Sequence, residues 1–255
     1  MSKVLAIALN TFRETVRDKI LYTLLVFAFA MIGSAAVLIR ISVRAEERIL
    51  QDLGLAAISI MGVLMATFVG ITLVYKEVDR RTIYTILAKP IHRYQFILGK
   101  YLGLLATLLV NVAAMALGLL LLDRALSGRW DWILLAAIWL TYAELALVTA
   151  LATLFSAFTT PVLSATFTLS LFLIGRLSSD LVSFLGKAPS AAVRALAVGL
   201  YYLLPNLHFF DIKGQVVLGQ APDPRWMVGA TAYGFLYIFF VLAGTALVFQ
   251  RRDFK

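Results

Sequence analysis

The stretch YKEVDRRTIYTILAKPIHRYQFILGKYLG, from Tyr75 to Gly103, is the most polar long segment of a very apolar chain. Its only acids are Glu77 and Asp79. Apolar runs long enough to cross a bilayer lie on both sides of it. A basic loop between two membrane spans stays in the cytoplasm by the positive-inside rule, so this loop predicts the direction of the spans. Its basic residues are Lys76, Arg80, Arg81, Lys89, Arg93 and Lys100.

Within this loop the residue pattern predicts a short amphipathic helix. Val78, Thr82, Thr85 and Ile86 recur at the three-to-four spacing of a helix face. Pro90 ends the pattern, because the residue before a proline avoids helical geometry. The loop is therefore expected to present a compact basic surface, suited to docking a soluble partner.

The composition places the chain among integral membrane proteins. Hydrophobic residues make up 62% of its 255 residues, charged residues 15%, and the mean hydropathy is +0.91. Soluble domains are about 45–50% apolar and about 25% charged. The net charge of +9 is placed at span ends, which favours a topology signal and membrane lipids with anionic headgroups rather than nucleic acid.

The expected fold is an all-α membrane protein, a single transmembrane domain over residues 1–255 with six transmembrane helices. At about 20 residues per span, the length leaves room for roughly six helices. The basic residues near both termini and in the loop predict that both termini are cytoplasmic. The spans are expected at residues 20–39, 53–74, 96–122, 132–155, 161–177 and 226–249.

Two further segments carry a helical pattern outside the spans. In residues 1–19, the stripe Leu5, Leu9, Phe12 and Val16 predicts a basic amphipathic helix lying in the membrane interface; an ordinary lead-in to the first span is the alternative. Residues 178–225 form a long extracytoplasmic segment. Its apolar part, residues 191–204, is too short to span comfortably and is expected to lie on or dip into the outer membrane surface.

Glu144 is the acid deep inside a predicted span, the fourth. A charge at that depth costs about 2.5–3.5 kcal/mol on insertion scales, and such residues face the bundle interior or a wet cavity. One hypothesis makes Glu144 part of a translocation path, contacting substrate or carrying a proton. The other makes it a packing residue that is protonated or hydrogen-bonded to Thr141, Tyr142 or Thr149.

No catalytic or metal site is evident in the sequence. His92 and His208 are expected on opposite sides of the membrane and cannot share a metal; at most, His208 and Asp211 form a weak outer polar site. Cysteine is absent. The chain has no GxxxxGK[ST] phosphate loop, so it is not expected to bind ATP in the usual way. Gly99 and Gly103 form a GxxxG pair that predicts close helix packing.

The loop motif resembles a known family. The pattern E-x4-T-x4-L-x-K-P-I-x-R-x5-G-K, from Glu77 to Lys100, is similar to the cytoplasmic loop of type-2 ABC transporter permeases. The sequence LLPNLHFFD, at residues 203–211, resembles the outer segment before the last span of these proteins, and the N-terminal helix resembles their elbow helix. Among subgroups, the permeases of nitrous-oxide-reductase maturation are the nearest in size and layout.

The resemblance implies a dimeric permease in the bacterial inner membrane, with an identical or paralogous second copy. A separate ABC-type ATPase subunit would hold ATP and Mg²⁺, and the permease itself would carry no cofactor and be no enzyme. Export by alternating access is the implied mechanism. The short cytoplasmic coupling helix, within residues 75–95, would contact the ATPase through Glu77, Arg80, Arg81, Thr82, Ile86, Pro90 and Arg93.

Two other functions remain as alternatives. A stand-alone proton-coupled secondary transporter would use Glu144 as its proton site. A membrane-embedded enzyme would need a catalytic constellation that the sequence does not show. The sequence leaves open the substrate and the identity of the second permease copy.

Overall fold

The computed structural model describes residues 3–39, 46–79, 92–178, 199 and 204–251. These residues form helices and connecting segments, with no strand among them. The elements are α1 (Lys3–Val16), α2 (Lys19–Ile39), α3 (Glu46–Asp79), α5 (Arg93–Ser127), α6 (Ile133–Ser156), α7 (Pro161–Arg176), η1 (Leu207–Phe210), α10 (Lys213–Val217) and α11 (Pro224–Arg251).

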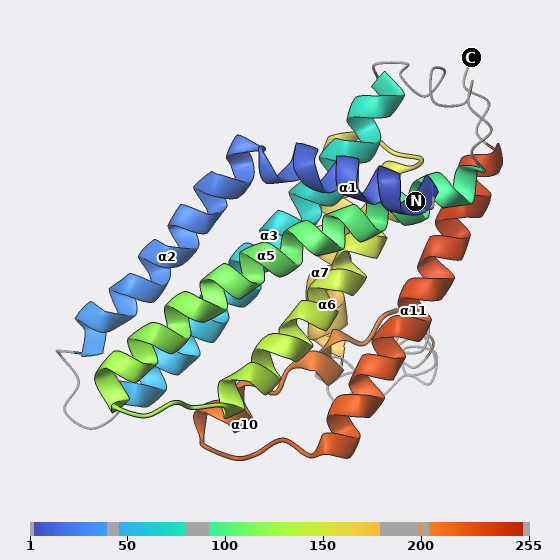
Figure 1. Cartoon of the computed structure of the whole chain (residues 1–255). Coiled ribbons are helices and arrows are strands. Elements are labelled where there is room, and N and C mark those ends of the chain that lie inside the picture. Colours follow the sequence, from blue (N-terminus) through green and yellow to red (C-terminus); the bar gives the residue numbers. More distant parts are fainter. Residues whose placement is uncertain (1–2, 40–45, 80–91, 179–198, 200–203, 252–255) are drawn as a thin grey trace.

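The long helices alternate in direction within one bundle. Helices α2, α5 and α7 run away from the end at which α1 lies, and α3, α6 and α11 run back toward it (Figure 1). The last turn of α3, the first turn of α5 and the last turn of α11 therefore share one end with α1, here called the α1 end. The far end of the bundle holds α10 and the start of α11.

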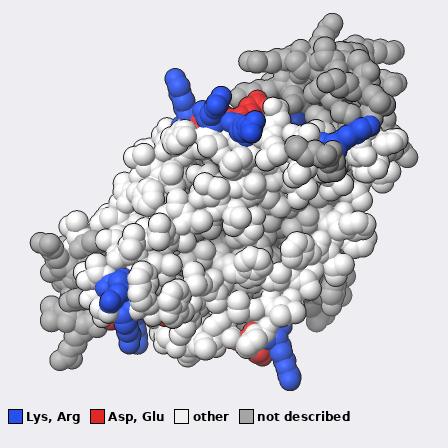
Figure 2. All heavy atoms as spheres, in the orientation of Figure 1, with Lys and Arg blue, Asp and Glu red and all other residues white. Residues whose placement is uncertain are grey.

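The surface has the charge distribution of a membrane protein. On the face shown in Figure 2, Lys, Arg, Asp and Glu gather toward the two ends, and a broad belt between them is free of charge. Large apolar side chains are exposed along the helices, for example Val26 at 67%, Phe235 at 65% and Phe239 at 67%. Because such a belt is suited to lipid rather than to water, the chain is a multi-pass membrane protein.

Four helices of the described chain are long and apolar enough to cross a membrane by themselves, and a fifth span follows if the bent α1–α2 pair counts as one. Helix α7 has 16 residues and is about 24 Å long, shorter than the ~30 Å hydrocarbon core. The expectation of six spans is thus confirmed only in part. The four spans are Glu47–Ile71, Tyr94–Ser127, Ile133–Ser156 and Pro224–Val248.

The second span was expected to begin at Leu53, after a polar loop, and this expectation is wrong. Helix α3 begins at Glu46, because Leu50 packs in the core and Gln51 finds a buried hydrogen-bond partner on α5. The third span, expected to end at residue 122, was also placed too short. Helix α5 continues to Ser127 and ends at Gly128, whose φ of 73° is the left-handed geometry of a helix C-cap.

Small residues allow the helices to approach closely. A Cβ on Gly62 would lie 2.5 Å from Leu145 of α6, and one on Gly70 would lie 2.7 Å from Ala152. Because Gly62 and Gly70 follow one another along α3 in the same order as Leu145 and Ala152 along α6, the two helices are neighbours that run parallel. Small residues at a crossing bring helices into the close van der Waals contact that drives their association in lipid.

The GxxxG prediction is confirmed at the crossing of α1 and α5. A Cβ on Gly99 would lie 2.9 Å from the carbonyl oxygen of Val4, and one on Gly103 would lie 2.6 Å from that of Ala8. Helix α1 thus packs closely on α5, while Leu5 of its apolar stripe is 49% exposed. This exposure suits a helix in the membrane interface, a placement that stays a prediction.

Candidate functional site

A charge network joins three segments of the bundle. Arg176 is the last residue of α7, and its guanidinium reaches two carboxylates. Nη1 donates to Oε1 of Glu144 on α6 over 2.6 Å, and Nη2 donates to Oδ2 of Asp211, just after η1, over 2.7 Å. Such charge-assisted bonds are among the strongest in proteins, and the rigid guanidinium fork is suited to holding two carboxylates in fixed directions.

The network runs from a dry site to a wetter one. The side chain of Glu144 is 1% exposed, that of Arg176 22% and that of Asp211 30%. Glu144 is shielded because α6 lies inside the bundle, in contact with α3, α5, α7 and α11. An ionised carboxylate buried in this way depends on its partner, since an unpaired buried charge is very costly.

Local hydrogen bonds hold the segment that carries Asp211 against α7. Asn206 caps η1: its Oδ1 accepts from the backbone N–H of His208 over 3.1 Å and from the Ser178 hydroxyl over 3.0 Å. The backbone N–H of Asn206 donates to the Tyr233 hydroxyl over 2.9 Å. Gly175 allows the contact, because a Cβ there would lie 2.5 Å from the carbonyl oxygen of the residue before Asn206. The position of Asp211 is thus set by the chain around it.

A second basic group lies near the network. Burial lowers the pKa of the Lys213 ammonium, and the neighbouring Arg176 lowers it further, while Glu144 and Asp211 act in the opposite direction. Two carboxylates and two basic groups therefore share one region. The Asp52 carboxylate also raises the pKa of Lys213, so acidic and basic groups are mixed here, and pairing of opposite charges is how charged groups are tolerated next to a membrane interior.

One carboxylate oxygen of Glu144 has no hydrogen-bond partner among the described residues. Its Oε2 and the Oγ1 of Thr141, one helical turn earlier on α6, are buried and make no hydrogen bond within the described structure. Buried polar atoms are paired in the great majority of cases. Glu144 Oε2 can therefore accept a hydrogen bond from water or from a polar group of a substrate.

The structure changes the predicted surroundings of Glu144. Its partner is Arg176, and not one of its neighbours on α6: the Tyr142 hydroxyl donates to the Leu105 carbonyl over 3.2 Å, and that of Thr149 donates to a carbonyl one turn earlier on α6 over 2.8 Å. The predicted hydrogen-bond partners are therefore wrong, whereas a place in the translocation path stays a prediction. Sequence reasoning missed Arg176, a basic residue at the end of an apolar run.

The predicted outer polar site of His208 and Asp211 is also replaced. The Asp211 carboxylate forms an ion pair with Arg176, while the His208 side chain is exposed. No group of three or more potential metal ligands from His, Cys, Asp and Glu occurs among the described residues. The ion pairs of Arg176 with Glu144 and Asp211 are here called the brace, because they hold α6, α7 and the segment after η1 together. The Oε2 of Glu144 is the acceptor of this group that has no hydrogen-bond partner among the described residues.

The predicted coupling residues lie mostly outside the described residues. Glu77 belongs to the last turn of α3, and Arg93 is the first residue of α5. Between them, residues 80–91 lie outside the described residues, and so do residues 191–198 and 200–203 of the predicted outer helix. The coupling helix thus stays a prediction for Arg80, Arg81, Thr82, Ile86 and Pro90.

Comparison with known proteins gives one family. A family model described as ABC-2 family transporter protein matches residues 5–254. Comparison with curated proteins found no match. The family match extends from α1 to beyond α11, and so it includes the charge network and both ends of the bundle.

Proposed function

Since the chain belongs to the ABC-2 family of transporter proteins, we propose that it is the permease of an exporter that works by alternating access. As a member of this family it is the membrane subunit of an ABC transporter and not the catalytic one, and membership implies an ABC ATPase as partner. The proposed assembly pairs two permease copies in the bacterial inner membrane, with all six expected spans and both termini in the cytoplasm. ATP and Mg²⁺ would be held by the ATPase subunits.

The proposal rests chiefly on the arrangement at the α1 end. The last turn of α3 and the first turn of α5 lie at this end together with α1 and the last turn of α11 (Figure 1). The stretch that connects α3 to α5 carries the predicted coupling residues, from Arg80 to Pro90. A docked ATPase at this end would act on α3 and α5 directly, because the stretch continues into both.

The proposed mechanism gives Glu144 a role. Alternating access requires states that nucleotide stabilises differently. The brace formed by Arg176 ties α6 to α7 and to the segment after η1, so a change in the relative position of these elements must break or exchange its bonds. The Oε2 of Glu144 is buried and has no hydrogen-bond partner among the described residues, so it would meet a polar substrate group only in a state in which the helices around it have moved apart.

Binding of the ATPase tests the proposed docking. Thr82→Asp and Ile86→Asp place a charge in the predicted contact, where an unpaired charge is costly, so each variant should insert normally but lose the ATPase in a pull-down. Thr160→Asp is the matched control: it lies at the N-cap of α7, where Asp is well accepted. Retention of the ATPase and of transport by both loop variants would refute the coupling role.

A separate experiment tests the role of Glu144. The double variant Glu144→Gln with Arg176→Gln removes both charges of the buried pair, so it leaves no unpaired buried charge. Its stability should lie near that of the parent, whereas substrate-stimulated ATP hydrolysis by the assembled complex should fall. Unchanged transport would show that the pair only braces the fold.

A further inference from the structure

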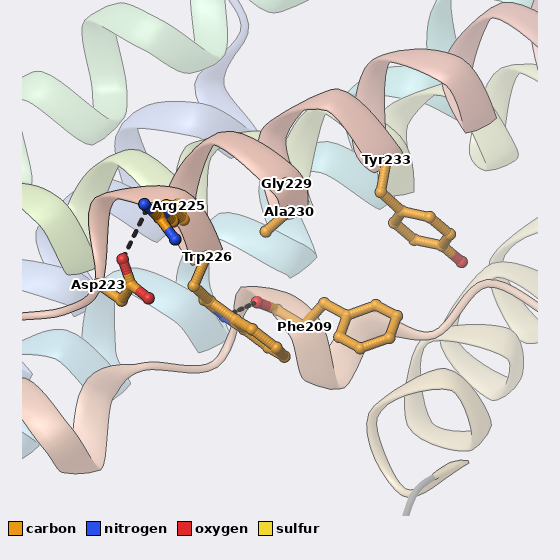
Figure 3. Close-up of a pocket in the computed structure, with 7 residues that line it drawn as sticks. All are labelled: Phe209, Asp223, Arg225, Trp226, Gly229, Ala230 and Tyr233. Atoms are coloured by element: carbon orange, nitrogen blue, oxygen red, sulfur yellow. Dashed lines mark hydrogen bonds between the residues drawn. The ribbon is translucent and has the colours of Figure 1, made fainter.

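An aromatic groove lies on the flank of α11 near the far end of the bundle. It has a volume of about 400 Å³ and is lined by Phe209, Trp226, Gly229, Ala230 and Tyr233, with Asp223 and Arg225 at one end (Figure 3). The Trp226 and Tyr233 rings each stand edge-on to the Phe209 ring, with centroids 5.5 Å away in both cases. The Trp226 indole N–H donates to the Phe209 carbonyl over 3.2 Å, which holds the wall in place.

The groove is polar at its mouth and apolar below. Asp223 and Arg225 lie at the start of α11, and the Asp223 Oδ1 accepts from the backbone N–H of Arg225 over 2.9 Å. Both residues are exposed. From Arg225 to Tyr233 the helix descends about 12 Å at 1.5 Å per residue. A ligand here would place a charged group at the mouth and an apolar chain below.

The surrounding surface belongs to the membrane. Of the four spans, that of α11 is the least buried within the chain. Close to the groove, Val228 is 70% exposed and Trp226 46%. Tryptophan is enriched where a span meets the lipid headgroups, so the mouth of the groove lies at headgroup depth.

We propose that this groove binds one phospholipid whose zwitterionic headgroup carries a primary ammonium group, which can donate hydrogen bonds, as the quaternary ammonium of phosphatidylcholine cannot. The Arg225 guanidinium fits the lipid phosphate, and the second oxygen of Asp223 fits the ammonium group. The upper acyl chain lies along Gly229 and Ala230, against the Trp226 and Tyr233 rings. This proposal rests only on the placement of α11 in the membrane, and it stands or falls independently of the transport mechanism.

Tryptophan quenching tests the proposal directly. The full chain with Trp130→Phe, Trp132→Phe and Trp139→Phe keeps Trp226 as its only tryptophan. It is placed in nanodiscs with phosphatidylethanolamine, phosphatidylcholine or phosphatidylglycerol brominated high on the acyl chain. Phosphatidylethanolamine should quench Trp226 with an apparent affinity about two- to fivefold above that of the other two lipids, as expected for exposed charge pairs.

Two matched glycine variants locate the site. A Cβ on Gly229, like one on Gly244 of the same helix, would meet no atom within 4 Å. Gly229→Leu fills the groove and should abolish the lipid preference, whereas Gly244→Leu, outside the groove, should leave it unchanged. Arg225→Gln should remove the preference, so that the three lipids quench alike.

Three outcomes would overturn the proposal. Equal quenching by all three lipids would show ordinary annular contact, and stronger quenching by phosphatidylglycerol would indicate an anionic lipid. Quenching by none would mean that protein covers the groove. If the tryptophan variant does not fold, native mass spectrometry of the unsubstituted chain decides: retained phosphatidylethanolamine that is lost in Gly229→Leu but not in Gly244→Leu supports the site, and equal retention refutes it.

Discussion

At the α1 end, α1 crosses α5 through the small residues Gly99 and Gly103, whereas the far end is joined by charged and amide side chains. There, Gln51 of α3 donates one bond to Asp123 over 3.0 Å and one to Asp131 over 3.2 Å. A guanidinium from the turn after α5 also pairs with a carboxylate of α3 over 3.0 Å. Close packing of small residues stabilises the junction at the α1 end, and directed hydrogen bonds and an ion pair stabilise the junction at the far end.

This difference bears on how the bundle can move. Interlocked small residues keep one arrangement, because any shift opens voids or creates clashes. Ion pairs and hydrogen bonds can exchange partners between two discrete arrangements. We infer that α1 moves together with α5 as one unit, while rearrangement during transport takes place at the polar contacts of α6, α7 and the segment after η1.

Removal of the Arg176 side chain should produce the largest effect. Arg176→Ala leaves Glu144 buried without its partner, and loss of one member of a buried pair costs about 3–5 kcal/mol. The free energy of unfolding, measured by SDS titration in mixed micelles, should fall by an amount in this range. Arg225→Ala, which removes an exposed arginine, should change it little. Equal losses in the two variants would contradict the brace.

The junction at the α1 end should be next in sensitivity. Gly103→Leu drives a side chain into the carbonyl oxygen of Ala8 and into Thr11, and overpacking of this kind costs about 1–3 kcal/mol. The thermal midpoint in detergent should fall accordingly. Gly33→Leu is the control, because a Cβ on Gly33 meets nothing within 4 Å. A smaller effect at Gly103 than at Gly33 would contradict close packing of α1 on α5.

The outer bond of the brace should contribute less. Asp211→Asn keeps the Glu144–Arg176 pair, and loss of one charge-assisted bond at a partly exposed site costs about 1 kcal/mol. In an Arg176→Ala background the same substitution should have almost no effect, since the bond is already absent. A double-mutant cycle with additive free energies would show that Asp211 and Arg176 act separately.

The exposed ion pair should matter least. Arg129 and Glu47 have side chains 70% and 43% exposed, and exposed pairs contribute at most about 1 kcal/mol. Glu47→Gln should lower the thermal midpoint slightly at low salt. The difference from the parent should vanish at high salt, because salt screens exposed charges. A difference that persists at high salt would place the pair in a drier setting.

Most of the helices could be predicted from the sequence, and the errors have physical causes. The run from Pro161 was expected to end at Leu177, and α7 ends at Arg176. The larger errors occur where polar residues continue a helix. Gln51 and Asp123 fell just outside the expected spans, yet each is buried and helical because the other supplies its hydrogen bond. Local polarity does not reveal such a partner.

The sequence by itself determined the membrane location, the apolar helices and the GxxxG contact face of α5. These features are local, because a bilayer requires about 20 apolar residues in a row and a close crossing requires small residues four apart. Only the tertiary structure decided that Glu144 is paired with Arg176 and Arg176 with Asp211, across separations of 32 and 35 residues. An ion pair depends on where α6, α7 and the segment after η1 meet in space, and no spacing along the chain encodes that meeting point.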